Sequence, residues 1–406
     1  MNGLDFSCDV EVLGAGITGL TTAVVLQSLG LKVRIVAEHV PRQLPDQYCP
    51  AAVSTGYAMA SAYPHNLRVE NLSRISADSQ ELLRALETQP QSGVATYRLF
   101  EVFEQEPQAP ALGEHRMRLQ RFDGTPEKLR DTFNPPARPG AEHLWGWVFD
   151  TYFADMPMYL KYLSEMFLLR GGCFRNAVID RLEDVGKRDV KAVFNCLGLG
   201  AKSLCNDSAP AVVVRGKQVV VPGAPILKQE GRPVSYNYTP LPEVFSRGDG
   251  GPEYVHFFPR HDGWILGQTR EPGVVNDDGE WHGVAVKSET KDIGGCQIPV
   301  PIVELNRVLL RNWLGAELEE SHLHGREGYR YYRDPDGSGV RLQYEDLPHT
   351  RLIHNYGHGG SGITMSWGCA LQAARFYVEY DRKIETPKSG TEFEQLVRRL
   401  VYAPAE

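Results

Sequence analysis

The N-terminal residues change from a short strand-like run to a helix-length apolar run and back. Residues 10–13 are mostly apolar, residues 14–19 are rich in glycine, and residues 20–29 are apolar over the length of a helix. Residues 32–36 then return to β-branched side chains. This order predicts a strand, a tight turn, a helix and a second strand, which is the βαβ unit that opens a parallel sheet.

The rest of the chain alternates between helical and strand-like segments. Apolar spacing predicts helices over 72–86 and over 156–169, and a third helix that follows the glycine-rich residues 357–362 and runs to about residue 380. Strands are expected at 177–179, 191–198 and 350–355. The proline-rich residues 89–139 predict short strands at best, and residues 41–64 predict a loop-dominated crossover. Residues 211–270 hold β-branched and aromatic runs separated by Pro/Gly turns, which predicts an antiparallel sheet.

Residues 12–31 contain no charged side chain, and this length of twenty residues also suits a membrane span or the core of a signal peptide. The residues before it include Asp5, Asp9 and Glu11 and no Lys or Arg, which is the reverse of the basic start of a signal peptide. A buried parallel strand and a helix packed on a sheet also exclude charge. We therefore interpret the run as the βαβ unit and expect no membrane partner.

Composition narrows the class of protein further. The chain has 406 residues and a formal charge of −8, so no basic excess is present for binding nucleic acid. Its length fits two or three domains or one large interleaved fold. Its seven cysteines include no C-x-x-C pair, which favours free thiols in a reducing compartment. No metal site is expected, because His322 with His324 and His354 with His358 lack accompanying acidic or thiolate ligands.

The residues from Gly14 to Gly19 form G-x-G-x-x-G between the first strand and the helix. The first glycine permits the tight turn, the second lets a pyrophosphate approach, and the third allows close helix–sheet packing. Glu38 lies at the end of the second strand, where a carboxylate can bind a ribose hydroxyl. A glycine turn without a ligand is the alternative, but the order of elements favours a dinucleotide, either NAD or FAD.

A second glycine-rich turn lies near the C-terminus and has five glycines between Tyr356 and Gly368. Backbone amides in such a turn can bind the electron-rich edge of a reduced flavin, although a simple packing turn would look similar. Two widely separated βα units fit the extended FAD better than NAD.

The ordered set of motifs resembles the D-amino-acid oxidases and D-aspartate oxidases. The resemblance includes Ser366-Trp-Gly-Cys-Ala370 after the C-terminal turn and Gly328-Tyr-Arg330 before Arg333. It extends to Asn195-Cys-Leu-Gly198, Phe149-Asp-Thr151, Val214-Arg-Gly-Lys-Gln218 and Phe258-Pro-Arg260, whereas residues 65–140 match poorly.

The resemblance implies an α/β fold (α+β overall), with a Rossmann-like FAD-binding domain interleaved with an antiparallel-sheet substrate domain. The FAD-binding domain would comprise residues 1–64, 145–210 and 325–406, and the substrate domain residues 65–144 and 211–324. The residues expected to bind FAD are Gly14, Gly16, Ile17, Thr18, Gly19, Glu38, Val178, Gly198, Gly359, Gly360, Ser361, Gly362, Ile363 and Thr364.

Arg330 matches the family's arginine that binds the α-carboxylate of the substrate, and its planar fork suits two parallel hydrogen bonds to a carboxylate. A structural ion pair is the alternative role. His256 matches an active-site tyrosine of the family, and Tyr254 would face the same side of a regular strand, so either residue is a candidate for substrate contact. His256 could also be a packing histidine.

The resemblance predicts an oxidase that transfers a hydride from Cα of a D-amino acid to flavin N5. The products would be an imino or keto acid, ammonia and, from dioxygen, hydrogen peroxide. The alternatives are a glycine or secondary-amine oxidase, a biosynthetic tailoring flavoenzyme, an NAD-dependent dehydrogenase, and a flavin-binding protein without turnover. A cytoplasmic location is expected because the chain lacks the S-K-L type of C-terminus, and a homodimer is left open.

Overall fold

The N-terminal pattern folds as the strand β1 (Val10–Leu13), the helix α1 (Ile17–Ser28) and the strand β2 (Val33–Ala37). The computed structural model describes residues 7–40, 51, 53, 56, 58–63, 68–107, 119–179, 181–186 and 189–381. Most of the expected crossover at 41–64 lies outside these residues. The chain divides into unit 1 (Met1–Val94, Met156–Val212, Tyr331–Glu406) and unit 2 (Ala95–Asp155, Val213–Arg330).

Unit 1 is built on a sheet with the strand order β19-β20-β8-β1-β2-β7. The strands β7 (Cys173–Asn176), β8 (Ala192–Asn195) and β20 (Arg351–Tyr356) join β1 and β2 in parallel pairs, and β19 (Arg341–Asp346) adds an antiparallel edge. The expected strand at 177–179 is wrong. Pairing with β2 ends at Asn176 and is followed only by a bond from Ala177 N to Ala37 O (3.1 Å).

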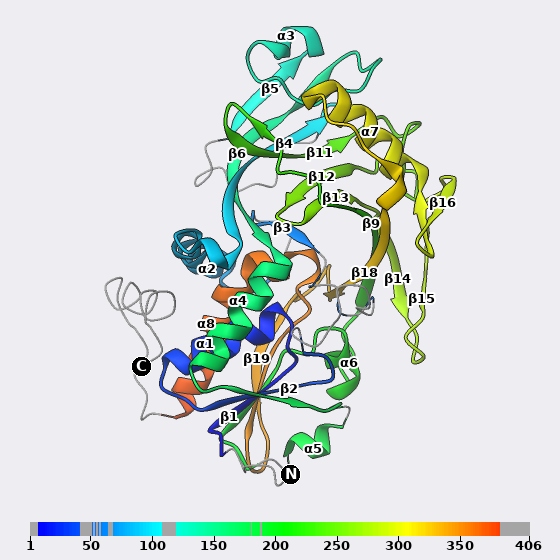
Figure 1. Ribbon diagram of the computed structural model, residues 1–406. Coiled ribbons are helices and arrows are strands. Elements are labelled where there is room, and N and C mark those ends of the chain that lie inside the picture. The colour runs from blue at the N-terminus through cyan, green and yellow to red at the C-terminus, as the bar shows by residue number, and fades with distance from the viewer. Residues whose placement is uncertain are drawn as a thin grey trace. The chain divides into compact units, whose positions relative to one another are not determined.

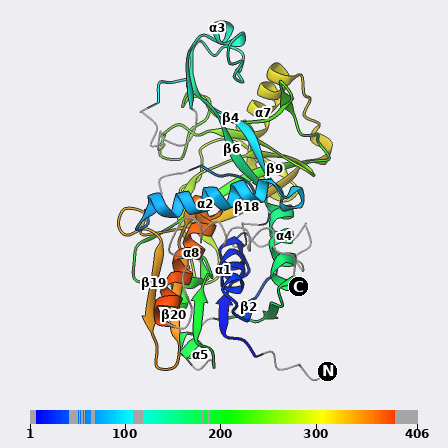
Figure 2. The same ribbon diagram turned by 90° about the vertical axis from the view of Figure 1, so that its left-hand side faces the viewer.

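The helices of unit 1 explain the uncharged N-terminal run. The helix α1 is buried along most of its length because α8 (Gly362–Tyr380) and α4 (Met156–Leu169) pack on it. The helix α2 (Leu72–Glu87) packs on α8, where a Cβ on Gly368 would lie 2.8 Å from Ile75 Cα. Figure 2 shows α1, α8 and α2 together. The short helices α5 (Leu182–Gly186) and α6 (Gly200–Leu204) and the strand β3 (Met59–Ser61) also belong to this unit.

Unit 2 contains a second sheet, in which neighbouring strands follow the order β15-β14-β9-β13-β12-β11-β4-β6. Its strands are β4 (Val94–Phe103), β6 (Leu144–Asp155), β9 (Ala211–Pro222), β11 (Arg232–Thr239), β12 (Val255–Arg260), β13 (Gly263–Gly267), β14 (Glu271–Val275) and β15 (Trp281–Gly283). Most pairs are antiparallel as expected, but β4 runs parallel to β11. β4 is also ten residues long, in a region where the sequence predicted only short strands.

Smaller elements complete unit 2. The strands β5 (Gln120–Gly124), β10 (Lys228–Gln229) and β18 (His324–Arg333) pair with β6, β11 and β9, respectively. β18 belongs to unit 2 as far as Arg330, and its last three residues belong to unit 1. The strands β16 (Thr290–Ile293) and β17 (Cys296–Pro299) form a hairpin that leads into the helix α7 (Val300–Leu314), and α3 (Pro126–Arg130) follows β5.

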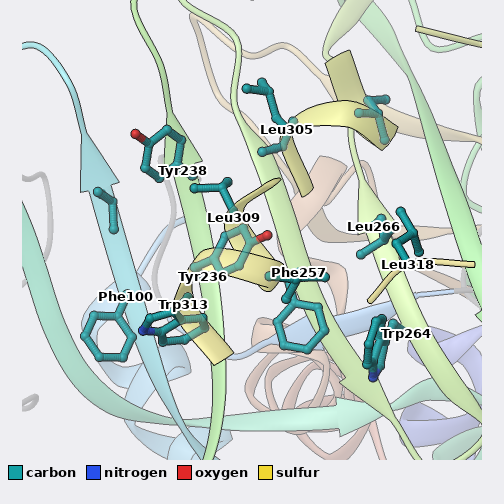
Figure 3. Packing of buried hydrophobic residues seen from close by; sticks show 14 of the residues in the cluster. Phe100, Tyr236, Tyr238, Phe257, Trp264, Leu266, Leu305, Leu309, Trp313 and Leu318 are labelled. Atoms are coloured by element: carbon teal, nitrogen blue, oxygen red, sulfur yellow. The ribbon is translucent and has the colours of Figure 1, made fainter. Parts of the chain in front are cut away.

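The core of unit 2 lies between its sheet and α7 (Figure 1). Phe100, Tyr236, Phe257 and Leu266 are cross-strand neighbours on β4, β11, β12 and β13 and are fully buried. Figure 3 shows them with Trp313 of α7, whose ring centroid lies 5.4 Å from that of Phe100. Because strand side chains alternate between faces, the adjacent row of Glu101, Asn237, His256 and Gly267 faces away from this core.

The observed units differ from the expected domains at three main places. Residues 145–155 and 325–330, expected in the FAD-binding domain, belong to unit 2, and residues 68–94, expected in the substrate domain, belong to unit 1 and include residues 72–87. Residues 72–87 form α2 in unit 1 because their apolar side packs on α8, whereas the sequence placed them in the substrate domain. The expected boundary at residue 64 falls outside the described residues. Within the described part of the chain, each helix is too short or too polar to span a membrane. The cytoplasmic location stays a prediction.

Candidate functional site

The turn after β1 is shaped so that only glycine fits at its first position. Gly14 has a φ of +98°, and a Cβ there would lie 2.5 Å from Cys196 O. Its amide donates to Val36 O (2.8 Å), which ties the turn to β2. The sequence predicted both the turn and its glycine, and the packing against Cys196 supplies the physical reason.

The remaining residues of the motif begin α1. Gly16 precedes the helix in an extended conformation and provides no side-chain cap, so the first helical N–H groups face the turn without a side-chain acceptor at that residue. Ile17 is buried, and Thr18 O accepts from Thr22 Oγ1 (2.7 Å). A Cβ on Gly19 would lie 2.9 Å from Gly14 C, so the third glycine lets the helix approach the turn. The glycine turn thus leads directly into the N-terminus of α1, which is the position where such helices bind phosphate.

Glu38 and Val178 follow two neighbouring strands of the same sheet. The side chain of Glu38 is 63% exposed just after β2, and Val178 is 61% exposed shortly after β7. Asn176 Nδ2 donates to Glu38 O (3.5 Å), which places the two strand ends side by side. Gly198, with a φ of +59°, follows β8 on the other side of β1. Predicted FAD residues therefore follow four adjacent parallel strands, at the sheet edge where such folds bind ligands.

The C-terminal glycine turn follows β20, the next strand of this sheet. Gly359 has a φ of +54°, and a Cβ there would lie 2.5 Å from Cζ of Tyr332. Ser361 N donates to His358 O (3.0 Å), and Gly360 lies in the same short turn. Gly362 and Ile363 begin α8, while the buried Thr364 donates to Ser61 O (3.4 Å). Burial lowers the pKa of His358 to about 4, and its Nε2 has no partner among the described residues.

A buried ionic network lies behind this turn, and the sequence did not predict it. Asp207 accepts from Arg333 Nε (2.6 Å) and from Tyr356 Oη (2.7 Å). Burial alone would raise the pKa of Asp207, but these hydrogen bonds lower it to about 2. Arg333 also donates to Gly339 O (3.1 Å). The network fixes the end of β20, where the glycine turn starts.

Arg330 lies on β18 of unit 2 and has no acidic partner in the described part of the chain. Its Nη2 donates to Gln268 Oε1. A Cβ on Gly216 would lie 3.1 Å from Arg330 Cζ, so glycine at that position of β9 makes room for the guanidinium. Neighbouring arginines differ, because Arg215 pairs with Glu271 (2.7 Å) and Arg270 with Glu253 (2.7 Å). Within the described residues, Arg330 therefore forms no ion pair and is a cation available to an anionic ligand.

Tyr254 is linked to Arg330 through Gln268. The hydroxyl oxygen of Tyr254 accepts from Gln268 Nε2, and the guanidinium of Arg270 lies 4.6 Å from its ring centroid. Burial raises the pKa of Tyr254, while Arg270 and Arg330 act in the opposite direction. Sequence reasoning missed Gln268, although a polar residue directly after the end of a strand was a usable signal.

His256 is buried beside Arg330 with both ring nitrogens unpartnered among the described residues. Burial, followed by the charge of Arg330, lowers its pKa to about 3, so the imidazole is neutral near pH 7. A Cβ on Gly267, its cross-strand neighbour, would lie 3.2 Å from His256 Nδ1. The centroids of Tyr254 and His256 are 6.4 Å apart, and Arg330 acts on the pKa of both. The structure thus brings the three predicted substrate residues together.

One group of potential metal ligands lies elsewhere in unit 2, formed by Asp155, His261 and Asp262. Asp155 Oδ2 already accepts from His261 N (2.8 Å) and lies 2.7 Å from His261 Nδ1. Both carboxylate oxygens of Asp262 accept from Arg260 (2.7 Å each). Hydrogen bonds within the protein thus already occupy these potential ligand atoms, and we propose no metal site here.

Comparison with known proteins assigns this chain to a family. Residues 9–376 match the family described as FAD dependent oxidoreductase. The chain belongs to this family. FAD is its cofactor, which agrees with two glycine turns that follow the parallel strands β1 and β20 and each lead into a helix.

Individual relatives agree with this assignment. A D-amino-acid oxidase of Rubrobacter xylanophilus is 30% identical over 89% of this chain and 94% of the relative. A D-amino-acid oxidase of Streptomyces coelicolor is 30% identical over 90% of this chain and 96% of the relative. The crystal structure of glycine oxidase from Geobacillus kaustophilus has a TM-score of 0.62 at 17% identity, covering 95% of this chain and 97% of that one, and shows the shared fold. The resemblance stated from the motifs is confirmed, as is the expected fold class.

Proposed function

We propose that this FAD-dependent oxidoreductase oxidises the CH–NH₂ group of a D-amino acid, with dioxygen as the electron acceptor. The observation that carries the proposal is Arg330, a cation without an acidic partner among the described residues, placed beside Tyr254 and His256. The two bacterial relatives named D-amino-acid oxidase support the D-configuration. The products would be an imino acid, which hydrolyses to a keto acid and ammonia, and hydrogen peroxide.

The glycine turns of unit 1 are the residues that would hold the cofactor. Gly14, Gly16, Ile17, Thr18 and Gly19 would hold the pyrophosphate at the N-terminus of α1. The ribose and adenine contacts would come from Glu38 and Val178, with Gly198 beside them. The residues Gly359, Gly360, Ser361, Gly362, Ile363 and Thr364 would contact the flavin. When bound, FAD supplies the hydride acceptor.

Arg330 would bind the α-carboxylate of the substrate through two parallel hydrogen bonds. Tyr254 would donate its hydroxyl hydrogen to the same ligand, and the neutral His256 would offer one donor and one acceptor nitrogen. These groups orient the substrate, and no protein nucleophile is required. A substrate with a neutral amine needs no side-chain base for loss of the hydride.

A peroxide-coupled panel of amines tests this function. D-amino acids should give peroxide, ammonia and the keto acid, while the matching L-amino acids should not. Turnover confined to glycine and sarcosine would replace the proposal with a glycine or secondary-amine oxidase. Bound FAD that no amine reduces under anaerobic conditions would favour a flavin-binding protein without turnover.

A further inference from the structure

Gln268 connects two hydrogen-bonding groups of the proposed substrate site, Arg330 and Tyr254. It directly follows β13, and its side-chain amide lies between Arg330 and Tyr254. The Oε1 atom accepts from Arg330 Nη2, and the Nε2 atom donates to the hydroxyl oxygen of Tyr254. Both bonds lie within unit 2.

The donor and acceptor roles of Arg330, Gln268 and Tyr254 leave one consistent arrangement of their hydrogen atoms. Arginine has only N–H donors, so the oxygen of the Gln268 amide must face Arg330. The amide nitrogen, also a donor, then faces Tyr254, whose oxygen must accept. The hydroxyl hydrogen of Tyr254 is therefore directed away from Gln268, and no acceptor for it is found among the described residues.

The charges around Arg330, Gln268 and Tyr254 favour binding of an anion. Arg270, which lies over the Tyr254 ring, is neutralised by Glu253, whose side chain is fully buried. Arg330 has no such carboxylate in the described part of unit 2. Among the described residues of unit 2, the remaining N–H groups of Arg330 and the O–H of Tyr254 thus form a set of donors whose positive charge is not paired with a carboxylate.

We propose that Gln268 is a positioning residue for binding of the substrate carboxylate. Its side chain holds Arg330 in place and keeps the Tyr254 hydroxyl oriented as a donor. The proposal rests on the proposed function, because it takes Arg330 as the carboxylate ligand. A glutamine is suited to this task since its amide offers one acceptor and one donor end. A glutamate would instead neutralise Arg330 and attract the hydroxyl hydrogen of Tyr254. A methionine of similar length would leave both groups without their partner.

The test uses the oxidised holoenzyme with propionate, a carboxylate without an amine, titrated by calorimetry. Gln268→Met should weaken propionate binding about tenfold, the loss expected for hydrogen bonds to a charged group. Gln268→Glu should weaken it further. KM for the amino acid should rise in parallel, while kcat changes less than KM. The matched control is Gln229→Leu, which removes another glutamine of unit 2 that donates to a backbone carbonyl, Asn134 O (3.3 Å). It should leave propionate binding unchanged.

A second comparison separates positioning from a general structural effect. In a Tyr254→Phe background, Gln268→Met should weaken propionate binding less than it does in the wild type, because the hydroxyl is already gone. Equal losses in the two backgrounds, or unchanged propionate affinity in both Gln268→Met and Gln268→Glu, would overturn the proposal. If no amine is oxidised but propionate binding responds as stated, the role of Gln268 stands and the proposed function fails.

Discussion

The imidazole of His256 is stacked on the ring of Phe258, with centroids 4.2 Å apart and planes inclined by 7°. The two residues alternate with the core residue Phe257 on β12, so they share the sheet face opposite α7. This stacking, together with the space left by Gly267, keeps the imidazole buried without a partner for either nitrogen in the described part of the chain.

The buried histidines predict that stability falls in mild acid. The pKa of His256 and His354 is lowered to about 3 and that of His358 to about 4, in each case first by burial. An unfolded histidine takes up a proton near pH 6.5, so below that pH the unfolded state binds more protons than the folded state. The free energy of unfolding should therefore decrease from pH 6.5 to pH 4, by up to about 1.4 kcal/mol per pH unit for each histidine.

Urea unfolding between pH 7 and pH 4 measures this slope. Replacing His256 with phenylalanine should make the slope shallower, because one proton-binding difference is removed. A slope that is the same in His256→Phe and in the wild type would show that folding does not lower the pKa of His256.

Gly14→Ala should abolish FAD binding. The φ of +98° is strained for alanine, and the new Cβ would meet Cys196 O at 2.5 Å. We expect a loss of stability of about 1–3 kcal/mol, measured by thermal unfolding, and a flavin-to-protein ratio close to zero. Gly30→Ala is the control, since Gly30 also has a positive φ (+84°) but open space around its Cβ position. It should keep its FAD, and a yellow Gly14→Ala protein would argue against the role of the turn.

Arg330→Leu should raise KM for the amino acid about 100-fold, because two charge-assisted hydrogen bonds worth about 3 kcal/mol together are lost. Steady-state kinetics on the substrate found in the amine panel measures this effect. The flavin content should stay unchanged, since Arg330 belongs to unit 2. Arg330→Lys should retain the charge but not the planar fork, so its KM should lie between those of the wild type and Arg330→Leu. Wild-type KM in Arg330→Leu would exclude the carboxylate role.

Asp207→Asn should destabilise unit 1 by about 2 kcal/mol, because Arg333 loses its buried counter-charge. Since the folded pKa of Asp207 is lowered to about 2, its contribution is present above the unfolded value of 3.8 and is lost as the pH falls toward 2. The loss at pH 7 is measured by urea unfolding. Glu317→Gln removes an exposed pair with Arg311, which water screens, and should therefore lower the free energy of unfolding by much less. Equal effects of the two substitutions would contradict a special role of the buried pair.

The sequence was most informative where local conformation is dictated by local residues. The strand Val10–Leu13, the glycine turn and the helix Met156–Leu169 were predicted because apolar spacing and glycine positions fix them over short distances. The 177–179 strand failed because pairing with β2 decides where β7 ends. Likewise, α2 was predicted as a helix but was placed in the substrate domain, because only its packing on α8 determines that it belongs to unit 1.

By itself, the sequence determined the βαβ opening, the two glycine-rich turns, the family and its FAD, and it singled out Arg330, Tyr254 and His256. Only the tertiary structure decided that Gln268 joins Arg330 to Tyr254 and that His256 is neutral and has no hydrogen-bond partner among the described residues. The physical reason is that hydrogen bonds and pKa values depend on which atoms meet and how much water reaches them. Gln268 and Arg330 are 62 residues apart, and β-sheet pairing, rather than any local pattern, brings them into contact.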